Sequence, residues 1–184
     1  VEHDDHRRDH DEAAADAHDR RAEADQRAAE HQKDPGDAPA AGDQVEVSFG
    51  GHSAQATASD DGTAVIWNTT TNRRLSIFEL DAPVIGVAFS PDNAFLATAV
   101  DDGRVVIWEI SSGTAVLTLT GHEGPVNDVV YSGDGQHLVT ASSDGTAKLW
   151  DTNGELLRTF AGHNGPVLNI ALSPDGSRLV TASV

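Results

Sequence analysis

The chain has 184 residues and a formal net charge of −18 at pH 7, from 30 acidic and 12 basic residues. This excess of carboxylates disfavours nucleic acid and anionic membranes as partners, because both require clusters of Lys and Arg. The sequence has no cysteine, which excludes disulfides, thiolate nucleophiles and cysteine-based metal sites. It also has no run of 18 apolar residues, so no transmembrane helix is expected.

Residues 1–33 are predicted to form an acidic, Ala-rich leader that is either helical or disordered. Ala, Arg, Glu and Gln favour helix, and pairs such as Asp16 and Arg20 have the supportive i,i+4 spacing. After the first residue, however, the leader contains no Leu, Ile, Val, Phe or Met, so it cannot build a core of its own. The prolines and glycines of residues 34–44 break any helix and predict a linker.

The leader also carries five of the nine histidines, which raises the possibility of a metal site. His6 and His10 would share one face of a helix, with His3 beside them, and imidazoles among carboxylates suit Zn²⁺, Cu²⁺ or Ni²⁺. A divalent-metal-binding leader is therefore one alternative function. We prefer to interpret the segment as a solvated region of biased composition, because nothing in it would bury or orient such ligands. No metal or other cofactor is expected.

From residue 45 onward, short apolar runs alternate with turn residues. The first strands of successive units are predicted at 45–49, 84–89, 126–131 and 167–172. Second strands are predicted at 54–58, 95–99, 137–141 and 178–182. Asp-Gly and Pro-Asp pairs between strands favour tight hairpins, because left-handed backbone is readily adopted there. Third strands end near Trp67, Trp108 and Trp150, and fourth strands are predicted at 75–78, 115–119 and 156–160.

Residues 61–68, 102–109 and 144–151 share one signature, in which Asp-Gly leads to a Trp that recurs about every forty residues. Gly-His pairs at His122 and His163 open two of the units. This pattern resembles the WD40 repeat. The resemblance implies an all-β propeller whose blades have four antiparallel strands. Blades are expected at about 45–80, 83–120 and 125–161, with a partial blade at 166–184.

The WD40 resemblance also implies a hydrogen-bonded tetrad of His, Ser or Thr, Asp and Trp in each blade. The complete set is His122, Thr140, Asp144 and Trp150. Partial sets are Thr57, Asp61 and Trp67, then Thr98, Asp102 and Trp108, then His163 and Thr181. A buried carboxylate needs a partner, and an imidazole placed between hydroxyl and carboxylate satisfies all three groups. We reject a Ser-His-Asp hydrolase, because the trio recurs in phase with the fold and brings no nucleophile elbow.

The turns that carry the Gly-His and Asp-Gly pairs should lie on one face of the propeller. That candidate partner-binding face would expose Asp60, Asp101, Glu123, Ser143 and Asn164, and its acids would attract a basic peptide. The alternative is general acidity that serves solubility. The predicted function is a non-catalytic scaffold for protein–protein interaction. A regulatory or sensor propeller of a larger enzyme is the main alternative.

About 3.5 blades are fewer than the roughly 4–8 blades of a closed ring, so we interpret the chain as a piece of a larger propeller. Residues 178–184 would then form a strand with an unpaired edge, which favours association. Side chains that would face a missing neighbour, such as Ile170 and Leu172, are expected to be exposed.

Overall fold

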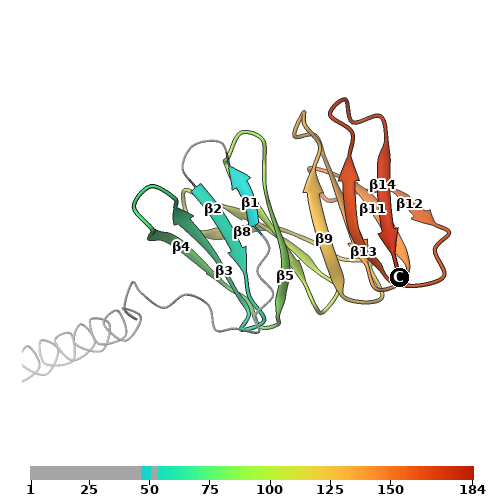
Figure 1. Ribbon diagram of the computed structural model, residues 1–184, viewed down its shortest axis with the longest axis horizontal. Helices are drawn as coiled ribbons and strands as arrows, with labels where there is room; N and C mark the ends of the chain where they lie inside the picture. The colour runs from blue at the N-terminus through green and yellow to red at the C-terminus, as the bar shows by residue number, and fades with distance from the viewer. Residues whose placement is uncertain (1–46, 51–53) are drawn as a thin grey trace, which may run out of the picture. The chain divides into compact units, whose positions relative to one another are not determined.

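The computed structural model describes residues 47–50 and 54–184 (Figure 1). The predicted leader and linker, and with them His3, His6 and His10, lie outside these residues. The described part of the chain forms fourteen strands and no helix. The all-β fold class expected from the sequence is therefore confirmed. Among the residues described, no helix has the length and apolar character that a membrane span needs.

The strands form four antiparallel sheets in chain order, and in each one neighbouring strands are also consecutive in sequence. The first sheet contains β1 (Val47–Gly50), β2 (Ala54–Ala58), β3 (Thr63–Asn68) and β4 (Arg73–Glu79). The second contains β5 (Val84–Phe89), β6 (Phe95–Val100), β7 (Val105–Glu109) and β8 (Thr114–Leu119). The third contains β9 (Val126–Tyr131), β10 (His137–Ser142), β11 (Thr146–Asp151) and β12 (Leu156–Ala161). The fourth contains β13 (Val167–Leu172) and β14 (Leu179–Ser183).

The hydrophobic core lies in layers between successive sheets. In β6, Leu96 packs toward the first sheet while Ala97 and Ala99 pack toward the third. In β10, Leu138 packs toward the second sheet and Val139 toward the fourth. Side chains of a strand alternate between faces, so a sheet covered on both sides needs apolar residues at nearly every position. This explains why the central strands read as continuous apolar runs.

Tight turns join the strands and bring neighbouring chain segments close together. Gly62, between β2 and β3, has a φ of 85°. A Cβ at this position would lie 2.7 Å from the carbonyl oxygen of Leu80, in the β4–β5 connection. Both the left-handed backbone and the missing side chain are therefore required there. Each such turn thus packs against the connection that leads into the next sheet.

The first strand of the fourth sheet is held to the third sheet by two polar side chains of β9. Asn127 donates from Nδ2 to the carbonyl oxygen of Val167 at 2.8 Å. Asp128 accepts the backbone N–H of Ile170 at 2.8 Å, and burial raises the pKa of this carboxyl. Both bonds use backbone groups of β13, which is paired along one edge only, with β14.

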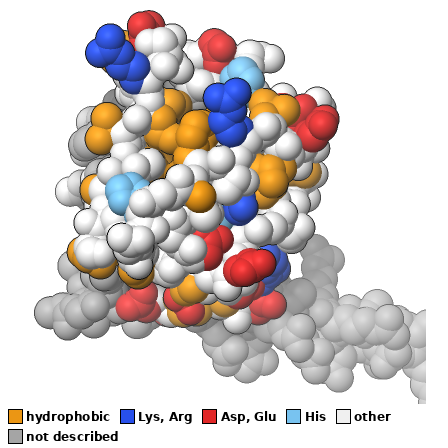
Figure 2. Space-filling model, turned by 90° about the vertical axis from the view of Figure 1, so that its right-hand side faces the viewer, with side chains coloured by type: hydrophobic (Ala, Val, Ile, Leu, Met, Phe, Trp, Pro, Cys, Tyr) orange, Lys and Arg blue, Asp and Glu red, His pale blue; other side chains and the backbone are white. Residues whose placement is uncertain are grey.

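The expected exposure of Ile170 is wrong. Its side chain is 7% exposed, because it packs with Val139 and Ala141 of the third sheet, and Leu172 is partly buried against the same cluster. The exposed apolar side chains of this part of the molecule are different ones. Figure 2 shows hydrophobic atoms on the surface at the right-hand side of Figure 1, where β12 and β14 lie. Exposed large hydrophobic residues of the third and fourth sheets are Leu156, Leu157, Leu168, Val180 and Val184.

Candidate partner-binding face

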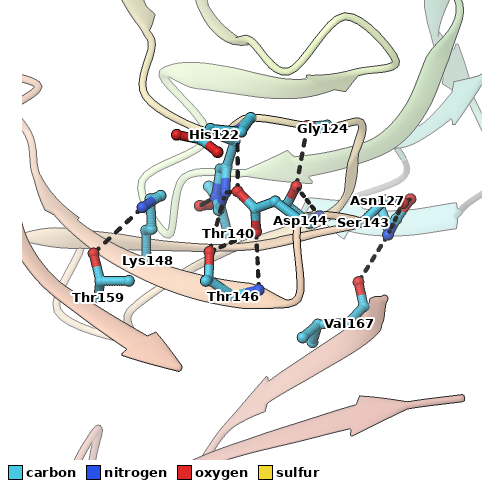
Figure 3. Close-up of polar contacts among 12 residues, drawn as sticks. His122, Gly124, Asn127, Thr140, Ser143, Asp144, Thr146, Lys148, Thr159 and Val167 are labelled. Carbon is cyan, nitrogen blue, oxygen red and sulfur yellow. Dashed lines mark hydrogen bonds and ion pairs between the residues drawn. The ribbon is translucent and has the colours of Figure 1, made fainter. Parts of the chain in front are cut away.

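A chain of hydrogen bonds runs through the third sheet and joins four of the predicted site residues. Figure 3 labels three of them, His122, Thr140 and Asp144. Trp150 Nε1 donates to Thr140 Oγ1 at 2.9 Å. The same oxygen lies 2.7 Å from His122 Nε2, and His122 Nδ1 lies 2.8 Å from Asp144 Oδ2. Thr140 is fully buried and the His122 side chain is 1% exposed. The structure therefore brings the full set together, with His122, Thr140 and Trp150 buried and the Asp144 side chain 11% exposed.

Burial and hydrogen bonding together set the protonation states of Asp144 and His122. Burial alone would raise its pKa, but hydrogen bonds from Thr146, His122 and the Glu123 amide outweigh burial and lower the pKa to about 2. Burial lowers the pKa of His122, against the opposing effect of Asp144. The imidazole is therefore neutral near pH 7. It donates from Nδ1 to Asp144 and accepts at Nε2 from Thr140, which accepts in turn from Trp150.

The same Asp144 also ties two connections of the chain together. It accepts the amide N–H and the hydroxyl of Thr146, at 2.9 and 2.6 Å, which closes the β10–β11 turn. It also accepts the amide N–H of Glu123 at 3.1 Å, from the β8–β9 connection. Because all these donors come from the chain itself, the network holds the turn and the connection in a fixed relation.

The second sheet keeps the Trp–Thr pair but closes its turn in another way. Trp108 Nε1 donates to Thr98 Oγ1 at 3.1 Å, and the Thr98 hydroxyl donates to the carbonyl oxygen of Val106, also at 3.1 Å. Partly buried Leu80 occupies the position at which the sequence pattern places a histidine. Asp102 is instead bound by Arg104 Nε at 2.6 Å, and the same guanidinium pairs with Asp81.

The first and fourth sheets contain the remaining predicted members of the tetrads. Trp67 Nε1 donates to Thr57 Oγ1 at 2.9 Å. Asp61 accepts the amide and the hydroxyl of Thr63, in the same way that Asp144 accepts those of Thr146. In the fourth sheet, His163 Nε2 lies 2.7 Å from Thr181 Oγ1, and His163 is exposed.

The candidate partner-binding face consists of the β2–β3, β6–β7 and β10–β11 turns with the β8–β9 and β12–β13 connections. These segments follow one another along one end of the sheets. A Cβ on Gly103 would lie 3.2 Å from the carbonyl oxygens of His122 and Gly124, and a Cβ on Gly124 would lie 3.1 Å from the Asp144 amide. A Cβ on Gly145 would lie 3.8 Å from the carbonyl oxygen of His163. The turns and connections thus form one continuous surface.

Four of the five residues predicted for this face are exposed, namely Asp60, Asp101, Glu123 and Asn164. Ser143 differs, because it is partly buried and its hydroxyl meets the Asn127 side chain at 3.0 and 3.2 Å (Figure 3). In the two Asp-Asp-Gly turns, the second aspartate holds the turn. Within the described residues, no hydrogen bond uses the carboxylate of the first one, Asp60 or Asp101. The first aspartates therefore remain able to contact a partner.

Sequence reasoning missed three residues that shape this face. Thr146 anchors Asp144, Asn127 engages Ser143, and Arg104 bridges Asp81 and Asp102. The sequence did contain a signal for Arg104. It follows Asp-Gly directly, at the position that Thr63 and Thr146 occupy in the other two turns. Among the described residues, no group of three or more His, Cys, Asp and Glu side chains is arranged to hold a metal ion.

The comparison with known families agrees with this architecture. The family described as WD domain, G-beta repeat, matches residues 74–109, 113–151 and 154–184, more than half of the chain. The chain therefore belongs to the WD40 family, and the resemblance inferred from the sequence is confirmed. The first match begins within β4, the other two begin just before β8 and β12, and each continues into the next sheet. A comparison with curated proteins found no match.

Proposed function

We propose that this chain is a non-catalytic scaffold that binds a basic segment of a partner protein through its candidate partner-binding face. WD40 repeats support a role in protein interaction in general. The proposal of a basic partner rests on one observation, which is that the turn aspartates have two different roles. Asp61, Asp102 and Asp144 are used to hold the fold, whereas Asp60 and Asp101 are exposed on the same turns.

The burial of Thr140 supports a non-catalytic role for the Thr-His-Asp trio. A nucleophilic hydroxyl must reach a substrate carbonyl, with a site nearby for the developing oxyanion. Thr140 is 0% exposed, and its oxygen already accepts from Trp150 and bonds to His122. No substrate atom can approach the Thr140 hydroxyl without unfolding the sheet. The three residues therefore form a hydrogen-bond network that stabilises the fold.

The acidic character of the exposed positions supports a basic partner. Asp60, Asp101 and Glu123 add negative charge to a surface on which Arg104 is bound by two carboxylates. Unpaired exposed carboxylates steer a cationic segment toward the surface and select against an acidic one. Such steering weakens as salt is added, because the Debye length is only about 8 Å at physiological ionic strength.

The test compares two variants of the full chain that lose the same charge. Asp60→Asn with Asp101→Asn changes the candidate face, whereas Glu155→Gln with Asp175→Asn changes exposed acids of turns at the opposite end of the strands. Binding to an array of basic, neutral and acidic peptides is measured at two salt concentrations. We expect only the first pair to weaken binding of the basic peptides, by about fivefold. Equal weakening by both pairs would show that only general acidity matters.

A further inference from the structure

A groove lies between the second and third sheets, at the end of the strands opposite the candidate partner-binding face. Its volume is about 670 Å³, within the range of about 300–1,000 Å³ that is usual for ligand pockets. The second sheet contributes the β5–β6 turn and strands β6 to β8. The third sheet contributes the end of β9, the β9–β10 turn, Leu138 of β10 and the β11–β12 turn. The groove is thus formed by two neighbouring sheets and uses none of the tetrad residues.

The walls of the groove are apolar and partly accessible. Phe95, Leu117 and Tyr131 are partly buried against the core, and the fully packed residues Ile107 and Leu138 lie behind them. A bulky side chain placed among these walls would leave water on entering, and such burial is the main favourable term in apolar binding. The walls therefore fit an aliphatic or aromatic side chain.

The rim of the groove is acidic. Asp92, Glu109 and Asp134 line it, and no Lys, Arg or His is among the lining residues of the described chain. Asp92 and Asp134 are fixed in place by equivalent bonds, since the Oδ1 atom of each accepts a serine hydroxyl at 2.6 Å and an amide at 3.0 Å. Serine and backbone hydrogen bonds lower the pKa of both groups, so both are ionised at neutral pH.

The phenol hydroxyl of Tyr131, on the apolar wall of the groove, remains available to a ligand. No hydrogen bond of the described residues uses the hydroxyl of Tyr131. Burial, together with the charge of nearby Asp92, raises the pKa of Tyr131, so the phenol keeps its proton and can donate. A ligand carbonyl is a suitable acceptor for this donor. Apolar walls, an acidic rim and one donor therefore occur together.

From this arrangement we propose that the groove is a second, independent peptide-binding site, which accepts a bulky apolar side chain flanked by Lys or Arg. The apolar side chain lies against Phe95, Leu117 and Tyr131. The flanking cations pair with Asp92 and Asp134, and a peptide carbonyl accepts from Tyr131. Charge complementarity identifies this occupant, because a groove with an acidic rim and no cation rejects acidic peptides. The proposal goes beyond the candidate face and does not depend on it.

The probes are three fluorescein-labelled peptides titrated into the full chain at low ionic strength. The first is Gly-Ser-Arg-Leu-Arg-Ser-Gly, the second replaces Leu by Ser, and the third replaces both Arg by Glu. Fluorescence polarisation gives the dissociation constants. We expect the first peptide to bind about tenfold more tightly than the second, because the leucine is buried, and the third not to bind. No binding of the first peptide, or equal binding of the first two, would overturn the proposal.

Two variants and a matched control then locate the site. Val116 lines the groove and is 52% exposed, so Val116→Trp blocks the groove without disturbing the core. We expect this variant to abolish the tenfold preference for the first peptide over the second, which the acidic candidate face alone does not produce, and Asp92→Asn with Asp134→Asn to weaken binding of the first peptide about fivefold. The control is Asp175→Asn, because Asp175 occupies the equivalent turn in the fourth sheet, with bonds from Ser173 and Ser177, but does not line the groove. A preference for the leucine peptide that survives Val116→Trp, or binding of that peptide that falls equally with Asp175→Asn, would place the leucine-binding site elsewhere and overturn the proposal.

Discussion

The second and third sheets contain the same Trp–Thr pair but stabilise it in different ways. In the third sheet, Thr140 is linked through neutral His122 to Asp144, and the histidine side chain is buried. In the second sheet, the Thr98 hydroxyl donates to Val106, and the acid of the turn is bound by Arg104, whose side chain is 34% exposed. The difference shows that the Trp–Thr pair belongs to the sheet itself. The partner of the turn aspartate can be either a buried imidazole or a surface cation.

The two turn aspartates should differ most in their effect on stability. Asp144→Ala removes a carboxylate that His122, Thr146 and the Glu123 amide all use, so it should lower the free energy of unfolding by about 3 kcal/mol. Asp102→Ala removes a partly exposed ion pair and a hydrogen bond from the exposed Arg104 amide, and should cost only about 1 kcal/mol. Denaturant unfolding of both variants measures the contrast. If both variants lost the same free energy of unfolding, burial of the third sheet's network would add nothing to stability.

The buried imidazole should contribute less than the carboxylate but more than an ordinary histidine. His122→Ala leaves Asp144 and Thr140 short of a partner and should cost roughly 1–3 kcal/mol. His137→Ala is the control, because the His137 side chain makes no hydrogen bond with any described residue, and it should cost no more than about 0.5 kcal/mol. Similar unfolding midpoints for the two variants would argue against the assigned role of His122.

Acid should weaken the third sheet in two pH ranges. The pKa of His122 is lower in the fold than its ordinary value of 6.5, so the unfolded chain takes up the proton first and stability falls as the pH drops below about 6.5. The pKa of Asp144 is about 2 instead of 3.8, so its contribution is present above pH 3.8 and is lost as the pH falls toward 2.

Comparing wild type with His122→Ala between pH 8 and pH 5 isolates the histidine. All other titrating groups are common to the two proteins, so their difference in unfolding free energy should shrink as the pH falls. This pH range spans the ordinary histidine pKa of about 6.5, so the unfolded chain changes protonation at His122 within it. A difference that grows with acid would mean that the folded protein binds the proton more tightly than the unfolded chain does, contrary to the burial of His122.

The smallest effect expected is that of the surface cation in the second sheet. Arg104→Gln breaks the contacts with Asp81 and Asp102 and should cost less than about 1 kcal/mol. This cost should shrink further when salt is added, because exposed ion pairs are screened. Thermal melts at low and high ionic strength measure it. A large and salt-independent loss would show that the ion pair is effectively buried, and the contrast between the two sheets would disappear.

Much of the fold was predictable, because each strand carries its own local signals. The expected strand at 54–58 coincides with β2, since apolar alternation and a following Asp-Gly pair define both of its ends. The WD40 family was recognisable from tryptophans that recur in phase. These features depend on residues close together in the sequence, and local patterns describe such residues well.

The details of the candidate face and the groove depend on contacts between distant residues and could not be predicted. Ser143 was expected at the surface, but Asn127, 16 residues earlier, partly covers it. Ile170 was expected to be exposed, but the third sheet buries it. The groove forms only where two sheets meet, and Phe95 and Tyr131 look like ordinary strand residues in the sequence. Such features require the positions of whole sheets, which no local pattern contains.

The most direct test of the account is a double-mutant cycle between His122 and Thr140, because the central claim is that their bond stabilises the fold. The unfolding free energies of His122→Ala, Thr140→Val and the double variant are measured, with His137→Ala and Thr140→Val as the control pair. We predict a coupling energy of about 1 kcal/mol or more for His122 and Thr140, and additivity within about 0.5 kcal/mol for the control pair. Additive effects for His122 and Thr140 would contradict the claim.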